Sequence, residues 1–266
     1  MTSGVSRRPL LGLLIPAAVA VLFIALPLIG LLAHVDWSRL PSELVSADVL
    51  TALRLSLECS LIAVAIALVI GVPLAHLLAR TSMPGRWVIR ALVTLPLVLP
   101  PVVGGIALQT ALGKATPIGA VLGHFGIVLP FSTAGAAIAE AFVGFPFLVI
   151  TVEAGLRQRN DHYEEVAATL GARPWRRFLH VTLPLAAPSI AAGAALCWAR
   201  ALGEFGATIT FAGSFPGTTE TLPIAAYSAF EGSGQVGEAI TLSLLLLTIS
   251  VLVLVVLRDR WLGALR

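Results

Sequence analysis

The stretch Glu164–Pro184, EEVAATLGARPWRRFLHVTLP, is a polar interruption between two long apolar segments. Asp161 can cap the start of a helix here, and Glu164 three residues later completes a capping-box pattern. Gly171 offers a left-handed stop, and Pro174 follows shortly after it. The sequence therefore predicts a short helix of about three turns with defined ends.

An amphipathic turn is expected directly after this helix. Trp175, Phe178 and Leu179 fall on one face, and Arg176 and Arg177 fall on another. Such a turn suits the headgroup region of a membrane, just before the next apolar segment begins at Leu183–Pro184.

The composition of the whole chain places it in a lipid bilayer. Of the 266 residues, 58% are hydrophobic and 12% are charged, whereas soluble domains carry about 25% charged residues. The net charge of +3 does not indicate nucleic-acid binding, because the arginines lie between apolar runs and form no single basic face. The two cysteines and five histidines show no metal-ligand spacing, so no metal or other cofactor is expected.

Six segments are apolar over the roughly 20 residues that a membrane-spanning helix requires. They cover residues 10–33, 55–79, 88–112, 130–152, 183–202 and 239–257. The first resembles a signal peptide, but its apolar run continues to Ala33, which favours a retained span. The expected fold is an all-α membrane protein with six transmembrane helices in one domain, residues 1–266.

The distribution of positive charge predicts the orientation, because cytoplasmic loops are rich in Lys and Arg. With both termini in the cytoplasm, most of the 17 Lys and Arg residues lie inside, including Arg7, Arg8, Arg80, Arg86, Arg90, Arg157, Arg159, Arg173, Arg176, Arg177, Arg258, Arg260 and Arg266. The expected location is the cytoplasmic membrane. The polar loop at about 157–182 then faces the cytoplasm.

Two interpretations of that loop follow from its residues. It is either an ordinary helical connection or a docking element for a cytoplasmic protein. A short helix is marginal in water by itself. Its capping pattern and its small residues Val166, Ala167 and Ala168 therefore favour a partner that packs closely against it.

The third apolar segment contains LPLVLPPVVGG, Leu95–Gly105, with prolines that remove backbone hydrogen bonds. Pro100 and Pro101 predict a broken helix, and Gly104 and Gly105 permit close approach of a neighbouring helix. A broken helix is tolerated where protein buries it or where it lines a cavity. The segment is either a static kink or a gate.

Beyond the fifth segment, GEFGATITFAGS, Gly203–Ser214, is rich in glycine and hydroxyl residues. Arg200 and Glu204 are four residues apart and can share a helix face. They either anchor the helix end or shape the mouth of a pathway. The hydroxyls of Thr208 and Ser214 suit transient contact with an oxyanion, although a polar external loop explains the same composition.

The polar loop resembles the EAA loop of ATP-binding-cassette (ABC) importer permeases. In that pattern E-A-A is followed after three residues by Gly and after nine more by I-x-L-P. Here Glu165–Ala167 reads EVA, Gly171 follows at the required spacing, and Val181–Pro184 reads VTLP. Val166 and Val181 depart from the usual Ala and Ile, conservatively in each case.

The resemblance implies a coupling helix that seats in a groove of a cytoplasmic ATPase subunit, within a type I permease fold. Glu165 is the candidate polar contact, Ala167 the close-packing position and Gly171 the sharp turn. Asp161 and Glu164 complete the candidate coupling residues.

The same stretch, with GEFGATITFAG and LPLVLPPVVGG, resembles the permeases of molybdate importers. The resemblance implies a homodimer with two cytoplasmic ATPase subunits and an extracytoplasmic molybdate-binding protein. Permeases for sulfate or thiosulfate are close relatives, and tungstate is a third tetrahedral dianion that remains open as the substrate.

Two other functional classes are weaker alternatives. An ion-coupled secondary transporter usually carries paired broken helices, and only one such segment is found. An intramembrane enzyme would need a motif such as H-E-x-x-H or G-x-S-x-G, and the sequence contains neither. The chain also has no G-x-x-x-x-G-K-[ST] phosphate loop, so energy from ATP would have to come from a partner subunit.

Overall fold

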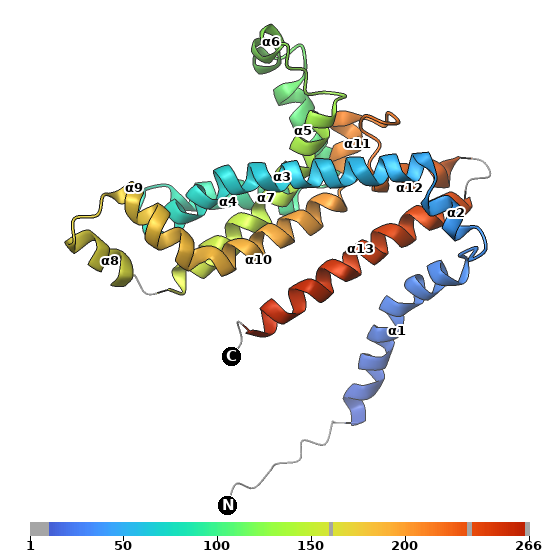
Figure 1. The fold of residues 1–266 in the computed structure, drawn as a ribbon, viewed down its shortest axis with the longest axis horizontal. Coiled ribbons are helices and arrows are strands. Elements are labelled where there is room, and N and C mark those ends of the chain that lie inside the picture. The colour runs from blue at the N-terminus through green and yellow to red at the C-terminus, as the bar shows by residue number, and fades with distance from the viewer. Residues whose placement is uncertain (1–10, 160–161, 233–235, 264–266) are drawn as a thin grey trace, which may run out of the picture.

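The computed structural model describes residues 11–159, 162–232 and 236–263, and every regular element in these ranges is a helix (Figure 1). In chain order the elements are α1 (Leu11–Ala33), α2 (Leu40–Leu44), α3 (Ala47–Arg80), α4 (Arg86–Val98), α5 (Pro101–Leu112), α6 (Pro117–His124), α7 (Thr133–Arg157), α8 (His162–Thr169), α9 (Pro174–Arg177), the π-helical turn η1 (Phe178–Thr182), α10 (Leu183–Leu202), α11 (Gly206–Ala212), α12 (Leu222–Glu231) and α13 (Val236–Gly263).

Five helices in the described part of the chain are long and apolar enough to cross a membrane. They correspond to the first, second, fourth, fifth and sixth of the predicted segments, and α10 has the bounds that the sequence predicts for the fifth. The third predicted segment, 88–112, is divided between α4 and α5. The all-helical membrane architecture is confirmed.

The centre of the bundle is built from α3, α7 and α10, which pack along one another (Figure 1). Small residues bring these helices close together. A Cβ added at Gly144 of α7 would lie 2.9 Å from the sulfur of Cys197 on α10. One added at Gly71 of α3 would lie 2.8 Å from the Leu148 side chain of α7. The core is therefore held by close backbone approach, as in other helical membrane proteins.

Local capping explains where the central helices begin. The hydroxyl of Ser46 accepts a hydrogen bond from the backbone N–H of Val49 at the start of α3 (3.4 Å). The hydroxyl of Ser132 accepts one from Gly135 at the start of α7 (3.1 Å). These side chains satisfy backbone donors that the first turn of a helix leaves free.

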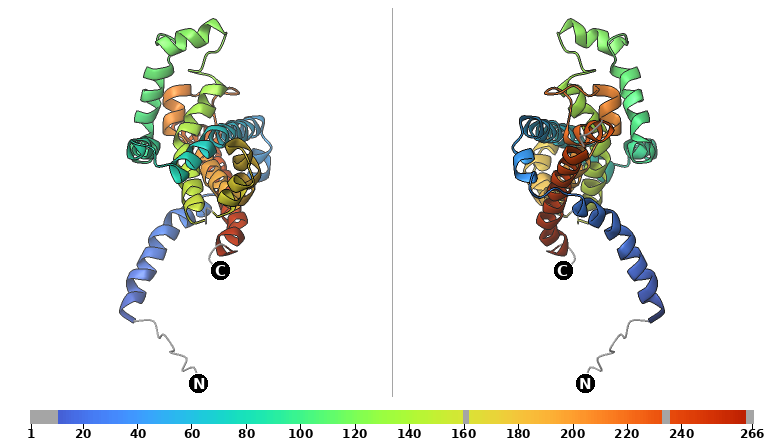
Figure 2. Two further views of the ribbon diagram at one scale, coloured as in Figure 1. Left: turned by 90° about the vertical axis from the view of Figure 1, so that its left-hand side faces the viewer. Right: turned by 90° about the vertical axis from the view of Figure 1, so that its right-hand side faces the viewer.

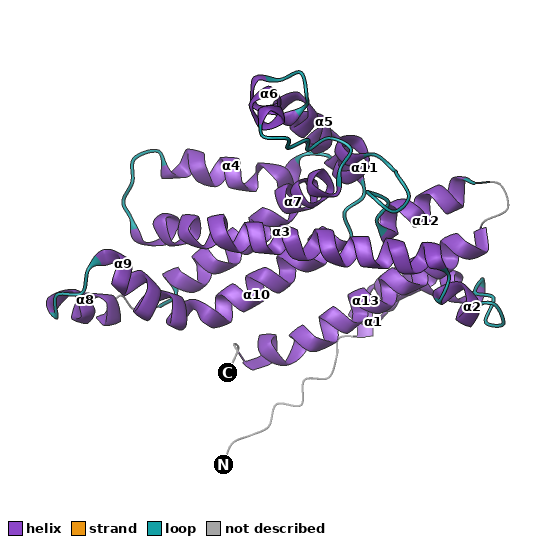
Figure 3. Ribbon diagram, turned by 45° about the horizontal axis from the view of Figure 1, so that its top comes forward, coloured by secondary structure: helices purple, strands orange, loops and turns teal. Residues whose placement is uncertain are grey.

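The break between α4 and α5 follows from two consecutive prolines. A proline disfavours the helical conformation of the residue before it. Pro100 therefore holds Leu99 in an extended backbone conformation, with ψ 134°, and Pro101 does the same to Pro100, with ψ 133°. Pro101 then begins α5, where its missing N–H costs nothing. α4 packs against α7, whereas α5 turns away toward α11 (Figure 3).

The first helix lies apart from the bundle. In both views of Figure 2, α1 extends away from the other helices, and its large apolar side chains, such as Ile15 and Phe23, are exposed. α6 projects at the opposite end of the molecule (Figure 2). Such apolar exposure is suited to lipid or to another subunit.

Candidate functional site

The α8 helix ends in a glycine stop, as predicted. Gly171 has φ +81°, its N–H donates to the carbonyl of Ala168 (2.9 Å), and the N–H of Ala172 donates to the carbonyl of Ala167 (3.0 Å). This pair of bonds is a Schellman motif, which uses a left-handed residue to satisfy the last carbonyls of a helix. The described helix has eight residues, so it is shorter than the predicted three turns. The proposed cap Asp161 lies outside the described residues.

Most of α8 and the residue after it are exposed. Tyr163 is 63% exposed, Val166 42% and Leu170, just beyond the helix, 82%, and Glu165 is exposed as well. Ala167, the predicted close-packing position, is half-buried. Figure 1 places α8 and α9 at one end of the bundle, beyond the ends of α3 and α10. A tip of this kind offers a partner both an apolar surface and a carboxylate.

Glu164 and Ala167 are the half-buried residues of α8, and Glu164 faces the bundle. Its Oε1 accepts a hydrogen bond from the Thr182 hydroxyl (3.0 Å) and lies 3.6 Å from Nε of Arg80. Thr182 is the last residue of η1, and Arg80 is the last residue of α3. Glu164 therefore contacts the bundle, whereas its neighbour Glu165 is exposed.

The apolar residues of the amphipathic turn predicted after α8 do not share one environment. Phe178 is buried, and its ring lies 5.0 Å from the ring of His76 on α3. Trp175 is 68% exposed and stacks on Phe178 with 5.6 Å between the ring centres. Phe178 thus anchors the loop in the core, so the three apolar residues do not form one membrane-facing surface.

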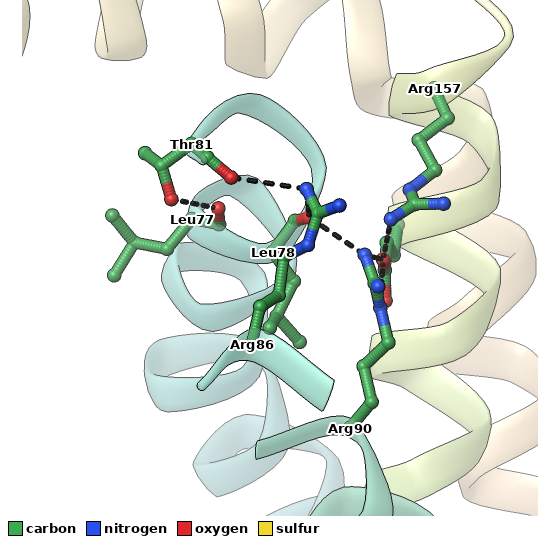
Figure 4. A network of polar contacts seen from close by, with 7 residues as sticks. Leu77, Leu78, Thr81, Arg86, Arg90 and Arg157 are labelled. Atoms are coloured by element: carbon green, nitrogen blue, oxygen red, sulfur yellow. Dashed lines mark hydrogen bonds and ion pairs between the residues drawn. The ribbon is translucent and has the colours of Figure 1, made fainter. Parts of the chain in front are cut away.

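A second polar network joins α3, α4 and α7 at the same end (Figure 4). Arg90 of α4 donates to Oε1 of Glu153 on α7 from Nε (2.8 Å) and Nη2 (2.6 Å), and Arg157 lies 3.0 Å from the same oxygen. Figure 4 shows Arg90 and Arg86 reaching the end of α3. Arg90 donates to the carbonyl of Leu78 (3.0 Å), and Arg86 donates to the carbonyl of Thr81 (3.1 Å).

From the sequence, these arginines were assigned to membrane orientation alone. One contact of the network does have a local signal: Glu153 and Arg157 are four residues apart on one helix, a spacing that favours an ion pair. The contacts between α4 and α7 carry no local signal. In the structure this network fixes α4, the first half of the broken segment, to the central helices.

The pair Arg200 and Glu204 forms the predicted contact, with 2.5 Å between Nη2 and Oε2. Glu204 is only 1% exposed, and its Oε1 accepts a hydrogen bond from the N–H of Ala207 (2.8 Å) at the start of α11. A buried carboxylate requires such partners, because isolated charge is costly away from water. The pair therefore stabilises the turn between α10 and α11.

The structure brings the broken segment against this turn. A Cβ added at Gly206 would lie 2.8 Å from Cβ of Pro101, and one added at Gly105 would lie 2.8 Å from the carbonyl oxygen of Ala207. Gly104 faces Phe142 of α7 instead, at 3.2 Å. The contact of α5 with α11 was not predicted from sequence, because nothing local relates the two segments.

The hydroxyl residues of the candidate pathway are not gathered at one place. Thr208 is fully buried within α11. Ser214 is exposed in the loop that follows, where its hydroxyl donates to Glu220 (3.3 Å). The structure therefore brings Pro101, Arg200, Glu204 and Thr208 to the start of α11 and places Ser214 beyond its end.

Known families and proteins resemble this chain over most of its length. The family described as "Binding-protein-dependent transport system inner membrane component" matches residues 67–266. The Molybdenum transport system permease protein ModB of Mycobacterium tuberculosis is 45% identical over 241 residues, covering 90% of this chain and 90% of that protein. The protein of the same name from Escherichia coli is 41% identical over 213 residues, covering 80% and 92%.

A related protein with another name also matches over most of its length. The Sulfate transport system permease protein CysT of Escherichia coli is 36% identical over 222 residues, covering 81% of this chain and 80% of that protein. Among solved structures, a bacterial ABC transporter involved in the import of the acidic polysaccharide alginate has the same fold, with a TM-score of 0.71 at 19% identity over 94% of this chain and 92% of that one.

Proposed function

The chain belongs to the family of binding-protein-dependent transport system inner membrane components, and on that premise we propose that it is the permease subunit of an ATP-driven molybdate importer. In this proposal residues 1–266 form one membrane domain with both termini in the cytoplasm. The permease would translocate the oxyanion and would itself hydrolyse no ATP.

The observation that carries this proposal is the exposed tip formed by α8. Its exposed residues include Tyr163, Val166, Leu170 and Glu165, and Gly171 ends the helix with a left-handed turn. The tip stands at the end of the bundle that is rich in arginine. A separate ATPase subunit that seats on this tip could push against a preformed helix.

The proposed cycle is alternating access in a homodimer. A binding protein on the outer side would deliver the anion, and two ATPase subunits would bind the two α8 tips. ATP-driven closure of the ATPases would move the tips together and open the pathway outward, and hydrolysis would reset it. The break at Pro100 and the turn at Glu204 are the proposed pathway elements, because both interrupt long helices and Gly206 brings the turn against Pro101.

The choice of molybdate rests on the relatives that carry the word molybdenum in their names. The two such relatives described above, from Mycobacterium tuberculosis and Escherichia coli, are 45% and 41% identical to this chain, compared with 36% for the sulfate permease. Sulfate, thiosulfate and tungstate are the alternative substrates, since sulfate, molybdate and tungstate are all tetrahedral dianions.

Uptake into proteoliposomes tests this proposal. The permease would be reconstituted with its ATPase and binding protein, and labelled molybdate would be followed in the presence of excess sulfate or tungstate. We expect uptake to require all three proteins and to persist in excess sulfate. Labelled sulfate carried in preference to molybdate would contradict the substrate, and molybdate uptake by the permease alone would contradict the ABC mechanism.

A further inference from the structure

Two adjacent glutamates on α8 have opposite environments. Glu165 is exposed, whereas the side chain of Glu164 is only 20% exposed and contacts the bundle. Because side chains one residue apart on a helix do not share a face, α8 can present one carboxylate to a partner and the other to its own chain. The two residues therefore need not have the same role.

The contacts of Glu164 join three separate elements. Its Oε1 accepts from the hydroxyl of Thr182 on η1 (3.0 Å) and lies 3.6 Å from Nε of Arg80 at the end of α3. Thr182 is 2% exposed and Arg80 is 13% exposed. Since water is largely excluded from these groups, the contacts are stronger than the same contacts on an open surface.

The position of Thr182 depends on a π-helical turn. The N–H of Leu183 donates to the carbonyl of Phe178, five residues earlier, so this hydrogen bond spans one residue more than the bond of an α-helix. π-turns inside α-helices are frequent at functional sites. Here the turn stands between α9 and α10 and places the Thr182 hydroxyl against α8.

Direct packing of α8 on the bundle is incomplete beside these contacts. A cavity of about 110 Å³ lies there, and its walls include Leu156, Tyr163 and Leu185 as well as Arg80, Glu164 and Thr182. The chain connection from α8 to α10 also passes through the turn at Gly171. A force on α8 can be lost in that turn unless side-chain contacts carry it across the gap.

We propose that Glu164 is a positioning residue that transmits the movement of α8 to α3 and α10. This inference rests on the proposed function, in which an ATPase displaces α8. The inference assigns different roles to Glu164 and Glu165. Glu165 belongs to the surface that the ATPase binds, and Glu164 belongs to the connection between that surface and the membrane helices. Loss of Glu164 should uncouple ATP hydrolysis from transport and leave the ATPase bound.

The test compares matched variants of the full importer in proteoliposomes. Thr182→Val keeps the volume of the side chain and removes the hydroxyl, whereas Thr182→Ser keeps the hydroxyl. Glu164→Ala removes the carboxylate, and Glu165→Ala removes its exposed neighbour. Each complex is measured for co-purification of the ATPase, basal ATP hydrolysis, stimulation of hydrolysis by molybdate-loaded binding protein, and molybdate uptake.

We expect Glu164→Ala and Thr182→Val to retain the ATPase and basal hydrolysis. Both the stimulation and the uptake should fall about five- to ten-fold, which lies within the roughly two- to thirty-fold range over which residues between coupled sites act. Thr182→Ser should behave as the unaltered protein. Glu165→Ala should instead release the ATPase. Normal activity in Thr182→Ser, together with the loss in Thr182→Val, would show that the hydroxyl contact and not the packing of the side chain is required.

Two results would overturn the inference. One is normal stimulation and uptake in Glu164→Ala and Thr182→Val, and the other is loss of the ATPase from Glu164→Ala to the same extent as from Glu165→Ala. Absence of ATP-dependent molybdate uptake in the unaltered complex is a different outcome. It would overturn the proposed function and, with it, the inference.

Discussion

Gly171 is the residue whose backbone conformation most directly shapes the α8 tip. Its φ of +81° is strained for any residue with a side chain, and a Cβ there would meet no atom within 4 Å. The requirement for glycine is therefore conformational and does not come from crowding.

Gly171→Ala should destabilise the end of α8 by about 1 kcal/mol and weaken retention of the ATPase, measured by co-purification. Gly123→Ala is the matched control. Gly123 lies in α6, a Cβ added to it would also meet no atom within 4 Å, and its φ is not positive. Equal retention of the ATPase by both variants would show that the conformation at Gly171 is unimportant for docking.

Glu153 is the acceptor on which the second network depends. It is 12% exposed and contacts both Arg90 and Arg157. Removing the charge of this largely buried acceptor leaves two partly exposed arginines, Arg90 and Arg157, without their partner, which costs more than the loss of a fully exposed pair.

Glu153→Gln should therefore lower the stability of the detergent-solubilised protein by about 1–3 kcal/mol, seen as a lower Tm. Glu58→Gln is its control, because Glu58 pairs with Arg54 at 3.8 Å and both side chains are exposed. That variant should change stability by less than about 1 kcal/mol. A Tm for Glu153→Gln equal to that of Glu58→Gln would refute the structural role of the network.

Among the elements, the contact between α5 and α11 is the tightest at the proposed pathway. A Cβ at Gly105 would lie 2.8 Å from a backbone oxygen of α11, whereas one at Gly104 would lie 3.2 Å from the Phe142 ring. The backbone of α11 can shift less than the Phe142 ring, so a side chain at Gly105 is harder to accommodate than one at Gly104.

Gly105→Ala should consequently separate α5 from α11, at a cost of about 1–3 kcal/mol, and reduce uptake. Gly104→Ala should be milder in both respects. Thermal unfolding and molybdate uptake of the two variants measure the difference. The reverse order of severity would mean that α5 is fixed by α7 and not by α11.

The long elements could be predicted from sequence because length and apolar character define a membrane span locally. The bounds of α10 match the prediction, and the break in 88–112 follows from adjacent prolines. The short helices α2, α6, α11 and α12 were not predicted. Their residues resemble ordinary loops or span ends, and helices of this length form only through contacts with the rest of the protein.

In the candidate site, too, local features could be predicted from sequence and contacts between distant segments could not. The Gly171 stop is encoded within a few residues and was predicted. Glu164 was expected to cap α8 with Asp161, but its partners on α3 and η1 are remote in sequence. The contact of Glu204 with Arg200 was expected, but Glu204 lies beyond the end of α10 at Leu202 and not on a shared helix face, and its burial was not predicted. Contacts between distant segments require the structure.

At the scale of the whole molecule, α8 and Ser214 should lie on opposite sides of the membrane. The two native cysteines, Cys59 and Cys197, are buried, so an introduced cysteine can be labelled selectively. In intact cells a membrane-impermeant maleimide should label Ser214→Cys directly. It should label Thr169→Cys only after the membrane is permeabilised. Labelling of Thr169→Cys in intact cells would reverse the orientation.

The most direct test of the central claim is the energy source of uptake. Molybdate uptake should continue when an uncoupler collapses the proton gradient while ATP is maintained, and it should stop when ATP is removed. A secondary transporter would respond in the opposite way. Uptake abolished by the uncoupler at constant ATP would contradict an ATP-driven importer.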